Sequence, residues 1–335
     1  MQQQWSSFSN VFNTRDAFVL AVIVDTQGST YHKAGAMMLV DGEGKSTGLL
    51  SGGCLEEDIC LHALSVMNGN QVKRLSYNLQ SDDDSLWGLG LGCDGALDIA
   101  LLPLNQHNAY LSFDKVIDAA KCGQSGEYHL SVGDKQIAHA NFMHSSHAFS
   151  ISAALLQNEL FQMSIEPALH MVICGAGPDA EPLVAMMKLL GWNVSLVDHR
   201  KVALRRQAFD ACQNKVLMKS TDEVASLFAK ANGVVIMTHS LERDGQLLTT
   251  ALNADIDYIG LLGPTARRDK LVGKHNVLPA YLDKIHGPIG LDIGGRGPEA
   301  IALSICAEIQ SYFANSAKQQ RQSSVKERYG DVEFG

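Results

Sequence analysis

Two loops that combine glycines with a cysteine are the parts of this chain best suited to chemistry. The first holds Gly52, Gly53 and Cys54 between a predicted strand and a predicted helix, and the second holds Gly92 and Cys93. Consecutive glycines leave backbone amides free to form a concave anion site. A cysteine at the start of a helix is placed where the helix dipole favours the thiolate. The sequence thus predicts two thiols on glycine-rich loops that can contact a soft metal or a sulfur-rich cofactor.

A purely structural interpretation of these loops stays open. Free cysteines are usually small buried residues, and glycines often serve tight turns. On that interpretation Cys54 and Cys93 are packing residues without a ligand. The polar segment 28–36 has the same ambiguity, because its hydroxyl, imidazole and ammonium groups either bind a phosphate or form a polar turn.

A dinucleotide-type turn lies within residues 171–180. Gly175 is predicted to make the tight turn and Gly177 to let the backbone approach a phosphate at the start of a helix. Asp198 ends the next predicted strand, where an acidic residue binds ribose hydroxyls. The alternative is a Rossmann scaffold without a nucleotide, because Asp179 brings negative charge to the place a phosphate would approach.

Two later loops carry arginines next to glycines. Arg267 and Arg268 follow a late strand, and Arg296 lies in the loop that opens the last helix. Both loops are expected at the carboxyl edge of the sheet, where doubly wound folds bind ligands. Arg296 is either a phosphate contact or an exposed surface arginine. The sequence contains no Ser-His-Asp elbow, HExxH motif or P-loop.

Two domains with different patterns of secondary structure are expected to position these residues. Residues 1–156 show short strands, glycine-rich turns and few helices, which is typical of an α+β domain. Residues 168–314 alternate strand and helix, which predicts a Rossmann-like, doubly wound parallel sheet. Residues 157–167 are predicted to be a linker, and the polar tail 315–335 is expected to be poorly ordered.

Composition argues against several classes of partner and compartment. The net charge of −9 disfavours nucleic acid and anionic membrane surfaces as partners. No apolar run approaches the roughly 18–20 residues that span a bilayer, and the first residues lack the pattern of a signal peptide. The chain is therefore expected to be cytoplasmic. Its seven cysteines include no CxxC pair, which favours reduced thiols.

Several segments of the chain resemble the XdhC/CoxI family, the accessory factors of xanthine dehydrogenase. The resemblance extends over residues 15–312, with the motifs in the family's order. The SGGCLE loop and the segment GPIGLDIGGRGPEAIALSI are specific to the family, whereas the Rossmann turn alone is not. The segments are GSTYHKAGAMMLV, GLLSGGCLEED, GLGCDGALDI, VICGAGPDAEPLV, YIGLLGPTARR and HGPIGLDIGGRGPEAIALSICAEI.

The resemblance implies a fold, a cofactor and partners. It implies an N-terminal XdhC/CoxI-type domain, a C-terminal Rossmann domain and a homodimer. Family members bind molybdenum cofactor, a pterin dithiolene that carries molybdenum. They protect it while a cysteine desulfurase supplies the terminal sulfur, and they pass it to the apo-dehydrogenase. By this resemblance Cys54 and Cys93 become candidate molybdenum contacts. The candidate cofactor-binding residues are Gly52, Gly53, Cys54, Gly92, Cys93, Gly175, Gly177, Asp198 and Arg296.

The leading hypothesis is a molybdenum-cofactor carrier and insertion chaperone without turnover chemistry of its own. An alternative from another class is an NAD(P)-dependent oxidoreductase that uses the Gly175 turn and Asp198. A third possibility is a docking protein that recognises the dehydrogenase and binds no small molecule.

Overall fold

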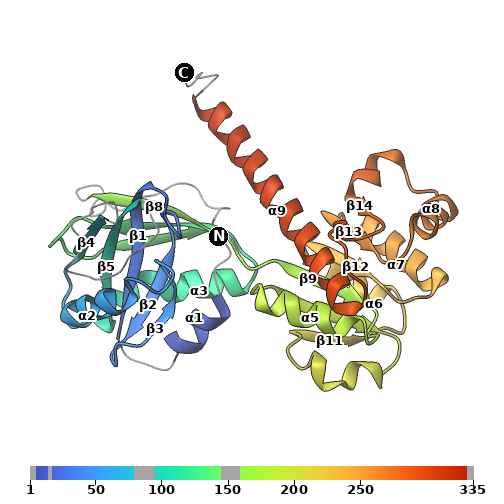
Figure 1. Ribbon diagram of the computed structural model, residues 1–335, viewed down its shortest axis with the longest axis horizontal. Coiled ribbons are helices and arrows are strands. Elements are labelled where there is room, and N and C mark those ends of the chain that lie inside the picture. The colour runs from blue at the N-terminus through green and yellow to red at the C-terminus, as the bar shows by residue number, and fades with distance from the viewer. Residues whose placement is uncertain (1–4, 14–16, 79–94, 145–158, 330–335) are drawn as a thin grey trace. The chain divides into compact units, whose positions relative to one another are not determined.

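The computed structural model divides the chain into two compact units, Met1–Ala168 and Leu169–Gly335 (Figure 1). The structure describes residues 5–13, 17–78, 95–144 and 159–329. Each unit has hydrophobic cores of its own. None of the helices in the described part of the chain combines the length and the apolar character needed to cross a membrane.

The N-terminal unit is built on a five-stranded antiparallel sheet in the order β3-β2-β1-β5-β4. Its strands are β1 (Phe18–Gly28), β2 (Met37–Asp41), β3 (Ser46–Gly48), β4 (Lys73–Asn78) and β5 (Gly95–Leu104). The apolar run at the start of β1 predicts a buried strand, and alternate residues of β1 enter two cores on opposite faces. Helix α2 (Glu56–Val66) contributes to one core, and helices α1 (Trp5–Phe12) and α3 (Phe113–Lys121) contribute to the other.

A second sheet of three strands completes this unit, in the order β7-β6-β8. Its strands are β6 (Gly126–Ser131), β7 (Ala140–His144) and β8 (Leu160–Ile165). Strand β8 corrects the predicted linker at 157–167, because residues 160–165 pair antiparallel with β6. Met163 and Ile165 are buried while Gln162 and Ser164 are exposed. That period of two fits a strand with one face on the core.

The C-terminal unit has the predicted parallel, doubly wound sheet, in the order β11-β10-β9-β12-β13-β14. Its strands are β9 (His170–Cys174), β10 (Asn193–Asp198), β11 (Asn214–Leu217), β12 (Gly233–Ile236), β13 (Tyr258–Leu261) and β14 (Ile285–His286). The strand order reverses between β9 and β12, and doubly wound folds bind ligands in the crevice at such a switch point.

Helices cover both faces of the parallel sheet. Helices α5 (Ala180–Leu189) and α9 (Pro298–Tyr329) share one core, and α6 (Asp222–Phe228), α7 (Leu241–Asn253) and α8 (Thr265–Lys274) share the other. Helix α9 corrects the predicted polar tail, because it continues through residues 315–329 (Figure 1). The polar composition of that stretch favours solvent-exposed chain, but a helix that is already nucleated extends at little further cost per residue.

Candidate functional site

The first glycine–cysteine loop lies between β3 and α2 and has a backbone that requires glycine. Gly52 and Gly53 have φ angles of +82° and +105°, which L side chains rarely adopt. A Cβ atom on Gly53 would meet no atom within 4 Å, so the space beside this residue is open. Cys54 follows directly and is exposed. The loop therefore presents its thiol on an accessible surface, and Cys54 is not a buried packing residue.

The predicted anion concavity of this loop exists, and it holds the carboxylate of Glu56. One carboxylate oxygen accepts hydrogen bonds from the amides of Leu50 and Ser51, over 2.9 and 2.8 Å. The other accepts from the Ser51 hydroxyl over 2.6 Å and from the amides of Gly53 and Leu55 over 2.9 and 3.2 Å. The expectation that these amides are free for an external anion is thus wrong.

The buried Glu56 is kept ionised by its donors. Burial raises the pKa of Glu56, but hydrogen bonds from Ser51 and Leu50 outweigh burial and hold it below its ordinary value. A carboxylate that accepts several backbone N–H bonds favours its charged form. Glu56 thus fixes the shape of the segment that carries Cys54, and the negative charge of the loop is already supplied from within the chain.

The polar segment 28–36 contacts the same loop. A Cβ atom on Gly52 would lie 3.2 Å from the ring of Tyr31, so the tyrosine ring rests against the glycine backbone. The His32 ring meets the Tyr31 ring edge to face, with centroids 4.7 Å apart. Burial lowers the pKa of His32, although the nearby Glu56 carboxylate raises it. The lowered pKa favours the neutral imidazole of His32, which lies beside the thiol loop.

The start of β5 lies beside the same segment. Gly95 pairs with Gly28 in the sheet register, and a Cβ atom on Gly95 would collide with the carbonyl oxygen of Ser29. This close approach explains one glycine of the segment 88–95. The other predicted site residues of that segment, Gly92 and Cys93, lie outside the described residues.

The Rossmann turn has the predicted local shape, and the chain's own atoms fill the space beside its glycines. Gly175 has φ +125°, and a Cβ atom there would collide with the carbonyl oxygen of Met237, the residue directly after β12. A Cβ atom on Gly177 would collide with Oδ1 of Asp179. Both glycines are buried. Each glycine thus permits a close contact within the protein.

Asp198 lies at the carboxyl end of β10, as predicted, and both of its oxygens accept hydrogen bonds. Oδ2 accepts from the amide of Ala176 over 2.7 Å and from Nη2 of Arg200 over 2.8 Å. Oδ1 accepts from the amide and Nε of Arg200, over 2.7 and 3.0 Å. Burial raises the pKa of Asp198, but the bonds from Arg200 and Ala176 outweigh burial and bring it to about 2. Asp198 therefore ties the turn to β10 as a carboxylate that is ionised at neutral pH.

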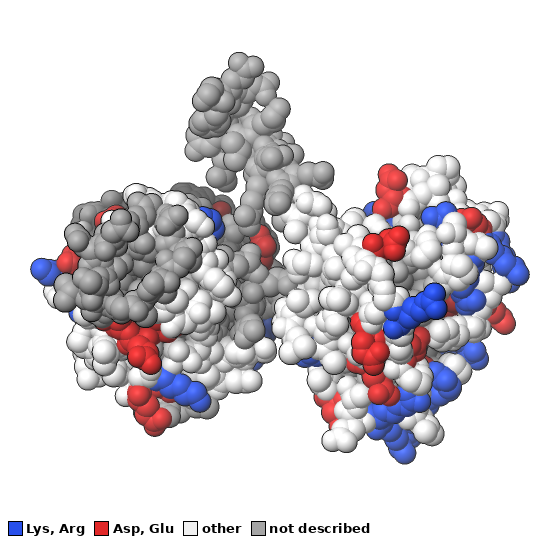
Figure 2. Space-filling view, in the orientation of Figure 1, with Lys and Arg blue, Asp and Glu red and all other residues white. Residues whose placement is uncertain are grey.

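The arginines singled out by the sequence have different surroundings. Arg267 binds the buried carboxylate of Asp244 through Nη2, over 2.5 Å, and so has a structural partner. Arg296 is exposed in the loop before α9. Figure 2 shows basic and acidic side chains interspersed on the visible face of the C-terminal unit.

A cluster around Glu308 was not predicted from the sequence. The Tyr258 hydroxyl donates to Oε1 of Glu308 over 2.5 Å, and the amide of Gly290 donates to Oε2 over 3.0 Å. His286 lies 3.3 Å from Oε1 and stacks on the Tyr258 ring. The available signal was a carboxylate next to Ile309 on the apolar face of the last helix, because a partly buried charge needs partners. The cluster ties β13, β14 and α9 together.

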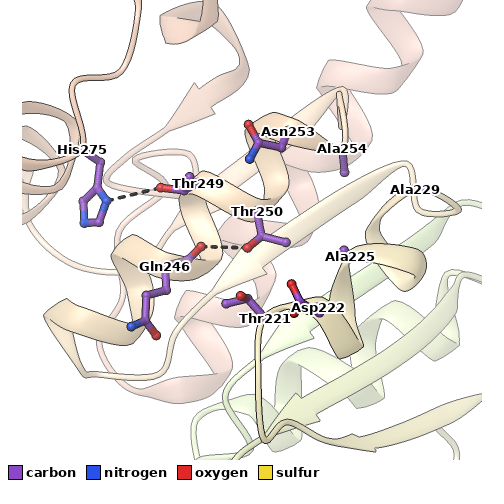
Figure 3. A pocket seen from close by; sticks show the side chains of 10 residues that line it. All are labelled: Thr221, Asp222, Ala225, Ala229, Gln246, Thr249, Thr250, Asn253, Ala254 and His275. Atoms are coloured by element: carbon purple, nitrogen blue, oxygen red, sulfur yellow. Dashed lines mark hydrogen bonds between the residues drawn. The ribbon is translucent and has the colours of Figure 1, made fainter.

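The structure also has a groove between α6 and α7, with a volume of about 630 Å³ (Figure 3). The residues that line it are Thr221, Asp222, Ala225, Ala229, Gln246, Thr249, Thr250, Asn253, Ala254 and His275. In the close-up, Nδ1 of His275 points at the Thr249 hydroxyl, which is 3.3 Å away. None of the site residues predicted from the sequence is among the lining residues.

Known proteins are similar to this chain over most of its length. A family model described as the XdhC Rossmann domain matches residues 171–309, and one for the XdhC and CoxI family matches residues 12–78. A protein of Bacillus subtilis named as a probable xanthine dehydrogenase subunit is 31% identical, over 87% of this chain and 92% of its own. The molybdenum cofactor insertion chaperone PaoD of Escherichia coli is 22% identical, over 88% of this chain and 82% of its own.

A solved structure is similar in fold as well as in sequence. It is the crystal structure of a xanthine dehydrogenase from Bacillus halodurans, with a TM-score of 0.80 and 28% identity. The match covers 94% of this chain and 96% of that one. With both halves matched by family models and a relative above 30% identity, the chain belongs to the XdhC and CoxI family.

Proposed function

We propose that this protein is a molybdenum-cofactor accessory protein, which binds the cofactor, protects it and inserts it into a xanthine dehydrogenase-type molybdoenzyme. Membership of the XdhC and CoxI family supports the proposal, as does similarity to a relative named as a molybdenum cofactor insertion chaperone. The observation that carries it is the exposed thiol of Cys54, held on a loop whose shape Glu56 fixes.

The side chains around Cys54 fit a metal that brings ligands of its own. Within the described ranges, no group of three or more His, Cys, Asp or Glu side chains is placed to hold a metal ion. Cys54 is exposed and the space beside Gly53 is open, so a bulky metal complex can reach the thiol. Bound cofactor supplies molybdenum already coordinated by its dithiolene, and a cysteine thiolate suits a metal in such a sulfur-rich setting.

The proposed contacts follow from this fit. Cys54 is the molybdenum contact in the described part of the chain, with Gly52 and Gly53 shaping the approach to it. Cys93 is the proposed second thiol contact, with Gly92 directly before it. One residue separates Cys93 from Gly95, and Gly95 lies beside the segment 28–36. The contact between Arg296 and the anionic phosphate of the cofactor stays a prediction.

The proposal extends to partners, assembly and compartment on the strength of the family resemblance. A cysteine desulfurase supplies the terminal sulfur while the cofactor is bound. The protein works as a homodimer in the cytoplasm. A chaperone of this kind needs no general acid, general base or nucleophile of its own, because the hydroxylation chemistry of the cofactor takes place in the client enzyme.

The contacts of the Rossmann turn do not favour an NAD(P)-dependent oxidoreductase. An acidic residue that binds ribose hydroxyls must have an oxygen available. Asp198 instead receives four hydrogen bonds from within the chain.

Transfer to a client enzyme tests the proposal. The purified protein is mixed anaerobically with molybdenum cofactor that already carries its terminal sulfur, separated from unbound cofactor by gel filtration and added to an apo-xanthine dehydrogenase. We expect cofactor to co-elute with the protein and dehydrogenase activity to appear without further cofactor. A docking protein without a small-molecule site would bind the apo-enzyme and deliver nothing, and that result would contradict the proposal.

A further inference from the structure

The glycine turn of the Rossmann domain is covered by one side chain of the protein itself. Phosphate recognition at such a turn needs an accessible glycine backbone and an unobstructed helix N-terminus. Here Gly175, Ala176 and Gly177 are all buried. The carboxylate of Asp179, directly before α5, lies over Gly177, because a Cβ atom on Gly177 would collide with its Oδ1.

His239 holds this carboxylate in place. Nε2 of His239 lies 2.8 Å from Oδ2 of Asp179, and since a carboxylate only accepts, the imidazole donates. His239 follows β12 in a left-handed conformation, with φ +60°. The pair therefore connects the loop after β9 with the loop after β12, at the switch point where the strand order reverses. Its position is the one that a dinucleotide pyrophosphate takes in folds of this class.

The neighbouring ribose position is also occupied from within the chain. The amide of Ala176 donates to Asp198, whose carboxylate is bound on its other side by Arg200. Two carboxylates, those of Asp179 and Asp198, thus lie at this edge of the sheet. Arg200 forms an ion pair with Asp198. A phosphate entering here meets a fixed negative charge in place of free amides.

We infer that Asp179, held in place by a hydrogen bond from His239, prevents the phosphates of dinucleotides from binding at the Rossmann turn of this protein. Asp179 is the residue that determines this exclusion. The inference goes beyond the proposed function and does not depend on it. Asp179 makes no side-chain cap to α5, so its removal leaves the hydrogen bonds of that helix intact.

Calorimetric titration with ADP and with NADH tests the inference. The test uses the full chain, an Asp179→Ser variant and an Asp222→Ser control. Asp222 is an exposed aspartate in the first turn of α6, so its replacement changes the net charge by the same amount without touching the turn. The wild type and the control are expected to show no saturable binding below about 1 mM. Asp179→Ser is expected to bind ADP at least about tenfold more tightly, because a fixed charge is removed from the phosphate position.

Two results would overturn the inference. One is binding of ADP or NADH by the wild type with a Kd below about 0.1 mM. The other is an Asp179→Ser variant that melts like the wild type and still binds no ADP. If that variant does not fold, Asp179→Asn carries the same test, because the amide keeps the shape and removes the charge.

Discussion

At the scale of single residues, Glu56 organises the loop that presents Cys54. Its carboxylate accepts five hydrogen bonds, so Glu56→Gln places an NH₂ group against N–H donors and leaves at least two of them without an acceptor. We expect the free energy of unfolding to fall by about 3 kcal/mol, measured by urea denaturation. Glu57→Gln is the matched control, because Glu57 is exposed on the same turn and its replacement should cost less than about 0.5 kcal/mol. Equal losses in the two variants would show that Glu56 does not hold the loop in this way.

Asp198 makes a pH-dependent contribution to the stability of the C-terminal unit. Its pKa of about 2 in the folded state lies below the ordinary value of 3.8, so its stabilisation is fully present above the ordinary value and is lost as the pH falls toward 2. The shift corresponds to about 2 kcal/mol. The gap in unfolding free energy between wild type and Asp198→Asn should therefore shrink by about this amount between pH ~5 and pH ~2. Unfolding curves at both pH values measure the gap, and a constant gap would show that the ionised form has no such role.

Residue types and spacing predict where these groups lie but not their partners. The glycine–cysteine loop predicts a concavity of backbone amides, and the structure has it. An acidic residue at the start of a helix is favoured there by the helix dipole alone, so the sequence does not indicate that Glu56 folds back into the concavity. The same holds for Asp179, whose contact with His239 joins residues 60 positions apart.

At the scale of elements, the packing of β9 against β12 depends on the absence of a side chain at Gly175. In Gly175→Ala the new Cβ atom would collide with the Met237 carbonyl, in addition to the strain of φ +125°. We expect a loss of more than about 3 kcal/mol in unfolding free energy. Gly294→Ala is the control in the same unit, because φ is +78° there and no atom lies within 4 Å. It should cost only the backbone strain, about 1–2 kcal/mol. Similar losses would show that crowding at the turn is unimportant.

Elements with strong periodicity could be predicted, and those that depend on distant partners could not. The alternation of strand and helix after residue 168, with the apolar runs of β9 and β12, predicts the parallel sheet of the C-terminal unit. Strand β8 alternates over only a few residues and pairs with a strand about 35 residues earlier, so its short pattern was too weak to predict a strand there. Helix α9 extends through a polar stretch whose composition is typical of disordered chain.

At the scale of the whole molecule, each unit has hydrophobic cores made of its own residues. The cores of the C-terminal unit draw only on residues after Ala168. We therefore expect residues 169–335, produced alone, to unfold cooperatively on heating, followed by circular dichroism. A fragment without a cooperative transition would show that its stability requires the N-terminal unit.

The contact between Cys54 and molybdenum cofactor is central to the proposed function. Equilibrium binding of the cofactor to two variants, each with one cysteine replaced, tests it most directly. Cys122 is the matched control, because it is the other exposed cysteine in the described part of the N-terminal unit and caps the C-terminus of α3. Under anaerobic conditions we predict stoichiometric cofactor binding by the wild type and by Cys122→Ser, and binding weakened at least about tenfold in Cys54→Ser. Equal affinity of the two variants, or no binding by the wild type, would contradict this role of Cys54.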